Sequence, residues 1–154
     1  MNIAKLFELQ ENLNNRIRTN ISIEKDSLIS KETLALQVKM AELANETQCF
    51  NFWSNDVTAN KDLILKEYIN CLNFILTLGL EKEFTDIKIN VKNNDGDITS
   101  QFLNLYIDIN DFIVCSSKDN YITLFEDFLS LGYSLGFSTK MIENAFYSKH
   151  SVLM

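Results

Sequence analysis

The sequence predicts an all-α fold, a helical bundle of about five to six helices in a single domain over residues 1–154. Three observations lead to this prediction. The chain contains no proline and only four glycines, so few residues would interrupt a helix. Apolar side chains recur at intervals of three and four residues, which is the helical period. Hydrophobic residues make up 46% of the 154 residues, which is enough for one packed core.

The first two helices are predicted from their apolar faces. Residues 2–19 form an amphipathic helix whose apolar face consists of Ile3, Leu6, Leu13 and Ile17. Residues 20–30 are polar and are predicted to be a loop, with Ser30 as the N-cap of the next helix. That second helix, over residues 31–48, is apolar around nearly its whole circumference. A helix of this kind belongs in a core.

The middle of the chain predicts a turn, a third helix and a connection. Residues 45–60 are rich in asparagine and aromatic residues and are predicted to be a turn. Residues 61–78 form a second strongly apolar helix, and Gly79 stands where a helix would stop. Residues 86–100 alternate apolar and polar side chains as a strand would, but the turn signal "NNDG" favours a connection.

Three helices complete the predicted bundle. Two of them lie near residues 98–115 and 118–135, where large apolar side chains follow the helical period. A last short helix begins after Ser138, which is its predicted N-cap. His150, near the end of this helix, is expected to be solvated.

Charge and cysteine content exclude several classes of protein. The formal net charge of −7 argues against nucleic-acid binding, which needs a basic surface. Cys49, Cys71 and Cys115 form no CxxC pair and are predicted to be reduced, mostly buried thiols of a cytoplasmic protein. No signal peptide is recognisable at the N-terminus. The longest apolar run, residues 71–80, is too short to span a membrane.

Two polar pairs interrupt the apolar helices. Lys39 and Glu42 lie three residues apart on the second helix, and Glu67 and Asn70 lie three apart on the third. Each pair shares a helix face. Two facing pairs of carboxylates would hold Mg²⁺, but here an ammonium and a neutral amide replace two of the four. The plainer interpretation is that Lys39 pairs with Glu42, and Glu67 bonds to Asn70.

Longer motifs resemble those of the dimeric all-α dUTPases of bacteria and phages, which are related to the MazG-like NTP pyrophosphohydrolases. The segments that carry the resemblance are "KLFELQENLNNRI", "LALQVKMAELANETQCFNFWS", "LKEYINCLNFILTLGLE" and the C-terminal stretch from "QFLNLYIDINDF" to "NAFYSK". Together they cover nearly the whole chain. The resemblance implies hydrolysis of dUTP, and usually of dUDP, to dUMP with Mg²⁺, and it implies a homodimer.

The resemblance also assigns roles to single residues. Glu42 and Glu67 match two of the four metal ligands, while Lys39 and Asn70 stand at the other two positions. Among the residues implied to bind nucleotide, Gln10 and Trp53 are kept. Asn73, at a third position implied to bind nucleotide, replaces a histidine of the family pattern. Asn51 replaces a lysine, and the basic tail that closes over the phosphates in the family is not found after Lys149.

Three functions follow from these departures. The first is an inactive or strongly impaired dUTPase homologue that binds a nucleotide or a protein partner, with weak or absent Mg²⁺ binding, in phage–host or mobile-element conflict. The second is an active Mg²⁺-dependent pyrophosphohydrolase with a rearranged site, using Glu42, Glu46 and Glu67 with Asp56 or Asp62. The third is a helical protein partner without a nucleotide pocket.

Overall fold

A computed structural model of the chain describes residues 1–18 and 22–152. It contains six α-helices, and the described residues include no strand, which confirms the predicted all-α fold. The helices are α1 (Ile3–Ile17), α2 (Lys25–Thr47), α3 (Lys61–Glu81), α4 (Ile98–Val114), α5 (Lys118–Ser134) and α6 (Thr139–Val152).

Side-chain caps fix where most of these helices begin. The Asn60 side chain accepts hydrogen bonds from the backbone N–H groups of Asp62 and Leu63, at the start of α3. Asp97 and Ser117 cap α4 and α5 in the same way. The Ser138 hydroxyl accepts from the N–H of Met141 at 3.1 Å, which confirms the predicted cap of α6.

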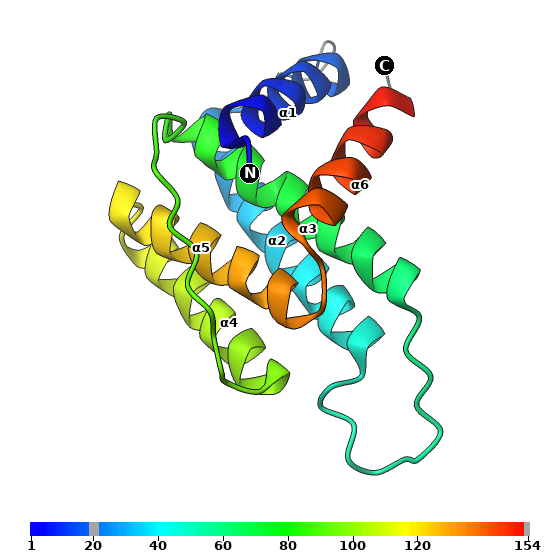
Figure 1. Ribbon diagram of the computed structural model, residues 1–154. Coiled ribbons are helices and arrows are strands. Elements are labelled where there is room, and N and C mark those ends of the chain that lie inside the picture. Colours follow the sequence, from blue (N-terminus) through cyan, green and yellow to red (C-terminus); the bar gives the residue numbers. More distant parts are fainter. Residues whose placement is uncertain (19–21, 153–154) are drawn as a thin grey trace.

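Helix α3 is the centre of the bundle. It packs against α1, α2, α5 and α6, and α4 packs against α2 and α5. In Figure 1, α2 and α3 run side by side, and the loop over residues 48–60 extends beyond their shared end. The fully buried side chains of α3 include those of Tyr68, Cys71, Leu72, Ile75 and Leu76. The residues of α3 that face α1 and α6 are therefore held in fixed positions.

The length of α3 corrects two expectations from the sequence. The helix continues through Gly79 to Glu81, so Gly79 does not end it but lies at a close contact with α5. By length and composition alone α3 could cross a membrane, although 56% of its apolar window is buried inside the protein. A core helix passes the same test, since burial and membrane insertion both select apolar residues.

Helix α2 begins earlier than predicted. It starts at Lys25, and the Ser30 hydroxyl donates to the Asp26 carbonyl at 3.1 Å instead of capping a helix. Of the predicted loop, residues 25–30 are helical, residues 22–24 are not, and residues 20 and 21 lie outside the described residues. The error arose because only Leu28 and Ile29 are apolar among residues 25–30, so no apolar period marks this part of α2.

The buried faces of α1 and α2 also differ from the predicted ones. The side chains of α1 that are buried are Leu6, Phe7, Gln10 and Asn14, whereas Ile17 is exposed. Two polar residues therefore replace apolar ones in the buried face of α1. On α2, Leu34 and Val38 are exposed, so this helix is not enclosed on all sides.

The segment over residues 82–97 is an irregular connection, as predicted, and it packs along α5. Its apolar side chains Ile87, Ile89 and Val91 are half-buried against the core. The Ser130 hydroxyl of α5 donates to the Lys92 carbonyl at 2.8 Å, and the Asn90 N–H donates to the Glu126 carboxylate. The alternating apolar residues therefore lie on one side of an extended segment, and no strand among the described residues pairs with it.

Candidate functional site

The two polar pairs singled out in the sequence are each closed by a contact within their own helix. On α2, the Lys39 ammonium lies 3.1 Å from a carboxylate oxygen of Glu42. On α3, the Asn70 amide donates to the Glu67 carboxylate at 3.4 Å. This is the plainer interpretation drawn from the spacing. The roles of these four residues in metal binding stay a prediction.

Both pairs lie around one buried point, the Cys71 thiol. Burial raises the pKa of Cys71, the charges of Glu67 and Glu42 raise it further, and the Lys39 ammonium opposes them. Lys39 and Glu42 belong to α2 and Glu67 belongs to α3, and these two helices pack together. Cys71 itself fills core space, while Cys49 is half-buried and Cys115 is exposed, so the thiols are less buried than expected.

A fifth residue joins this cluster from α6. The Lys149 ammonium donates a hydrogen bond to the side-chain carbonyl oxygen of Asn70. Burial lowers the pKa of Lys149, and the nearby ammonium groups of Lys39 and Lys66 lower it further, while Glu67 raises it. In the sequence, Lys149 stands out only as the last residue that resembles the family pattern. Its contact with α3 depends on the packing of α6, which no local pattern reveals.

These side chains do not fit a magnesium ion. Mg²⁺ prefers a nearly octahedral shell of oxygen atoms, and here the Glu42 carboxylate and the Asn70 oxygen each face an ammonium group. An ion at this place would have to displace or approach two positive charges. Nor do the described residues bring together three His, Cys, Asp or Glu side chains able to hold a metal. The alternative set built on Glu42, Glu46 and Glu67, with Asp56 or Asp62, stays a prediction.

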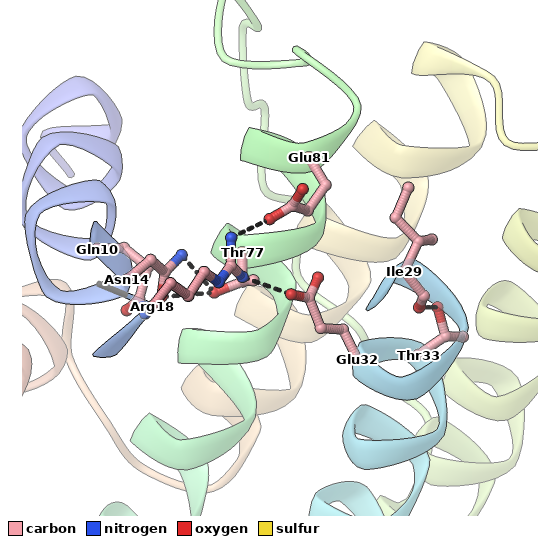
Figure 2. A network of polar contacts seen from close by, with 8 residues as sticks. All are labelled: Gln10, Asn14, Arg18, Ile29, Glu32, Thr33, Thr77 and Glu81. Carbon is pink, nitrogen blue, oxygen red and sulfur yellow. Dashed lines mark hydrogen bonds and ion pairs between the residues drawn. The ribbon is translucent and has the colours of Figure 1, made fainter. Parts of the chain in front are cut away.

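A second polar cluster lies between α1, α2 and α3 (Figure 2). The Gln10 amide bonds to Asn14 at 3.0 Å, and Asn14 bonds to the Thr77 hydroxyl at 3.1 Å. These residues border a cavity of about 280 Å³. Its lining also includes Leu13, Ile17, Arg18, Glu32, Asn73 and Phe74. The fold thus brings together two of the residues that the resemblance assigns to nucleotide binding, Gln10 and Asn73.

Two buried oxygen atoms on residues of this cavity have no hydrogen-bond partner in the described protein. They are Oδ1 of Asn73 and Oε2 of Glu32. A buried polar atom without a partner costs free energy. A ligand in the cavity that donates hydrogen bonds would remove that cost.

Among the residues that the structure describes, Glu32 has one ion-pair partner and shares it with a second carboxylate. Arg18, at the end of α1, forms ion pairs with Glu32 of α2 and Glu81 of α3. Burial raises the pKa of Glu32 to about 7, the Glu81 carboxylate adds to this, and Arg18 opposes it. Near neutral pH, Glu32 is therefore present both as a carboxylate and as a carboxylic acid that can donate a hydrogen bond.

His150 is buried, contrary to the expectation that it is solvated. Only 2% of the residue is exposed, and its ring stacks on Phe146 with 3.8 Å between the centroids. Nδ1 lies 2.8 Å from the Phe146 carbonyl oxygen, and Nε2 lies 3.0 Å from the side-chain oxygen Oε1 of Gln10. The expectation failed because α6 packs against α1 and α3 as far as His150.

The contact with His150 fixes the orientation of Gln10. Burial lowers the pKa of His150, the nearby Lys149 charge lowers it further, and the Phe146 carbonyl opposes them. The neutral ring has one N–H, which donates either from Nδ1 to the Phe146 carbonyl or from Nε2 to Oε1 of Gln10. The Gln10 amide NH₂ donates to Oδ1 of Asn14. Because His150 and Asn14 occupy both ends of the Gln10 amide, Asn73 is the amide of this cavity that is free to bind a ligand.

Trp53, the third residue assigned to nucleotide binding, lies elsewhere. It is 65% exposed in the loop over residues 48–60, where its ring contacts those of Phe50 and Phe52. The side chain of Asn51 organises this loop by accepting hydrogen bonds from the N–H groups of Trp53 and Ser54. Trp53 does not line the Gln10 cavity of the same chain, and its role stays a prediction.

Comparison with known proteins adds one finding. The family model described as dUTPase matches residues 2–153 of the chain. Neither the curated proteins nor the solved structures contain a significant match.

Proposed function

The chain belongs to the dUTPase family, and from this premise we propose that it binds a uracil deoxynucleotide without hydrolysing it through Mg²⁺. One observation carries the proposal. At the positions where the family presents carboxylates to a metal, the Lys39 ammonium pairs with Glu42 and the Lys149 ammonium bonds to Asn70.

The loss of the metal is expected to remove most of the catalytic power. A divalent ion stabilises charge on the leaving pyrophosphate and lowers the pKa of an attacking water. The barrier rises by several kcal/mol without it, and each 1.36 kcal/mol is a factor of ten in rate. An ammonium group can stabilise a phosphate oxygen, but it does not generate hydroxide from bound water.

The cavity beside Gln10 supports the binding part of the proposal. Uracil presents a carbonyl, an N–H and a second carbonyl along one edge. The free Oδ1 of Asn73 accepts from an N–H, and the protonated form of Glu32 donates to a carbonyl. A cavity of about 280 Å³ is sufficient for a nucleobase.

The direct test follows pyrophosphate release from dUTP in the presence of Mg²⁺, beside calorimetry with dUMP in EDTA. We expect binding of dUMP and no turnover above the uncatalysed rate. Turnover of order 1 s⁻¹, within the ordinary range for enzymes, would overturn the proposal. The Asn73→Ala variant should bind dUMP more weakly, whereas Asn104→Ala, on the exposed side of α4, should bind it normally.

We also propose that the chain forms a homodimer through α2 and α4. Leu34 and Val38 are exposed one turn apart on α2, and Leu103 and Ile107 are exposed one turn apart on α4. The Tyr106 hydroxyl joins these two helices by donating to the Gln37 carbonyl at 3.0 Å. An exposed apolar face of this kind is typical of a subunit interface. Light scattering of Val38→Asp and Ile107→Asp should show monomers where the wild type is a dimer.

A further inference from the structure

A groove between α3 and α6 lies beside the Lys39–Glu42 and Glu67–Asn70 pairs. It has a volume of about 400 Å³ and is lined by Asp62, Leu65, Lys66, Ile69, Ala145 and Lys149. Its walls are mainly aliphatic, and two of the lining residues carry ammonium groups. The groove is separate from the Gln10 cavity, whose residues on α3 lie further along the helix.

The two ammonium groups of the groove have no carboxylate partner. Among the described residues, neither Lys66 nor Lys149 takes part in an ion pair, whereas Lys39 is paired with Glu42. The hydrogen-bond partner of Lys149 is the neutral amide of Asn70. A half-buried ammonium group without an ion-pair partner is costly. Burial lowers the pKa of Lys149, and the nearby ammonium groups of Lys39 and Lys66 lower it further, although the Glu67 carboxylate opposes them. An anion in the groove would remove this cost.

The groove and the Gln10 cavity are connected along one polar stripe of α3. Lys66, Asn70, Asn73 and Thr77 follow each other at intervals of three and four residues, so they share one helix face. Asn73 borders the cavity, and Lys66 borders the groove. Seven residues of helix separate them, which is a rise of about 10 Å. That span suits a nucleotide whose base occupies the cavity and whose phosphates reach the groove.

We infer that Lys66 and Lys149 bind the phosphate groups of the nucleotide directly, in place of the magnesium ion used in the family. The inference rests on the proposed function for the identity of the ligand, but not for the chemistry of the groove. Two ammonium groups are donors and positive charges at once, which is what a di- or triphosphate needs. Phosphate binding by this chain is therefore independent of divalent metal.

Asp62 offers a test of whether the groove binds an anion or a cation. Its carboxylate lines the same groove and repels a phosphate. The neutral variant Asp62→Asn should therefore strengthen phosphate binding, whereas it would weaken the binding of a cation. No rearrangement of the fold is needed, since Asp62 is exposed in the first turn of α3.

Calorimetry with inorganic pyrophosphate, in EDTA and in Mg²⁺, tests the inference without the nucleobase. The wild type should bind pyrophosphate with the same affinity, within about twofold, in both buffers. Lys66→Gln and Lys149→Gln should each weaken binding at least tenfold, and Asp62→Asn should strengthen it. Lys140→Gln is the matched control, because Lys140 is an exposed lysine at the other end of α6. Circular dichroism establishes that each variant is folded, and Lys66 is exposed, so its variant keeps the test valid if Lys149→Gln unfolds.

Three outcomes would overturn the inference: no pyrophosphate binding, binding that requires Mg²⁺, or binding unaffected by Lys66→Gln in the folded protein. A parallel titration with deoxyuridine separates this inference from the proposed function. Pyrophosphate binding without deoxyuridine binding would support the lysine site and contradict the nucleobase cavity. Deoxyuridine binding without pyrophosphate binding would support the nucleobase cavity and contradict the lysine site.

Discussion

The Tyr121 hydroxyl of α5 lies against Gly79 of α3 and donates a hydrogen bond of 2.7 Å to the carbonyl of Ile75, one turn earlier. The reverse contact exists as well. The Tyr68 hydroxyl of α3 lies against Gly132 of α5 and donates to the Phe128 carbonyl at 2.8 Å. Each central helix thus inserts a tyrosine at a glycine of the other. This pair of contacts fixes the position of α3 relative to α5.

The first prediction is that alanine at either glycine destabilises the fold. A Cβ atom at position 79 or 132 would lie 2.3 Å from a tyrosine oxygen that is fully buried and hydrogen-bonded. Overpacking of this kind costs about 1–3 kcal/mol. Urea unfolding of Gly79→Ala and Gly132→Ala should show this loss. Gly96→Ala should be nearly neutral, because its Cβ meets only the end of the exposed Asn94 side chain.

Helix bounds could be predicted from the sequence, whereas the role of Gly79 in packing could not. Helices α4 and α5 were predicted within one residue because their large apolar side chains follow a regular period. A glycine near the end of an apolar run often follows the last turn of a helix, which is why the sequence predicts a helix stop at Gly79. Its actual role depends on a tyrosine that is 42 residues further along the chain, and no single-chain pattern indicates that contact.

In the candidate site, too, local contacts could be predicted from the sequence and tertiary contacts could not. The local pairs Lys39–Glu42 and Glu67–Asn70 followed from spacing alone, because residues three apart share a helix face. Gln10 and Asn73 were named separately by resemblance, and the packing of α1 on α3 placed them in one cavity. Lys149 and His150 were missed as site residues, because the end of α6 reaches α3 and α1 only through tertiary packing.

The second prediction concerns the pH dependence of stability. Asp108 of α4 is 7% exposed, and burial raises its pKa to about 8, with further contributions from Asp127 and Asp111. In the unfolded chain an aspartate titrates at about pH 3.9, so the folded state holds an extra proton between these values. The free energy of unfolding should therefore fall as pH rises from about 4 to 8.

The Asp108→Asn variant tests this dependence. It keeps a donor next to Asp127 and cannot ionise, so it should be more stable than the wild type at pH 8 and little changed at pH 4. Thermal unfolding across this range measures the difference. Asp86→Asn, at an exposed position of the connection over residues 82–97, should leave the pH profile unchanged. An equal stabilisation by Asp108→Asn at both pH values would contradict the assignment.

The third prediction concerns Arg18, which holds Glu32 and Glu81 together. Its removal leaves two mostly buried carboxylates without a cation, and breaking such a pair costs about 3–5 kcal/mol. The loss in Arg18→Gln should be larger at pH 8 than at pH 5. The reason is that the pKa of Glu32 is already about 7 and rises further without Arg18, so at low pH Glu32 is neutral and needs no partner.

Urea unfolding at the two pH values provides the measurement. Lys5→Gln breaks a comparable but exposed pair with Glu8, at 4.0 Å, and should cost less than about 1 kcal/mol at either pH. A pH-independent loss in Arg18→Gln would mean that Glu32 remains ionised throughout.

The fourth prediction is that two substitutions restore a metal site. Lys39→Glu together with Asn70→Asp places four carboxylates where α2 and α3 meet, beside Glu42 and Glu67. Without metal their mutual repulsion should lower the melting temperature below that of the wild type. Added Mg²⁺ or Mn²⁺ should reverse this loss, because a ligand that binds only the folded state stabilises it.

The same metals should leave the wild-type melting temperature unchanged, since the ammonium groups of Lys39 and Lys149 face Glu42 and Asn70. Glu42→Gln, added to the double variant, is the matched control and should weaken the response to metal. Lys39→Glu alone should respond weakly, because Asn70 contributes no charge and keeps its bond to Lys149. If the double variant bound metal no better than the wild type, the cause of the missing site would lie in the backbone positions of α2 and α3 rather than in the two exchanged side chains.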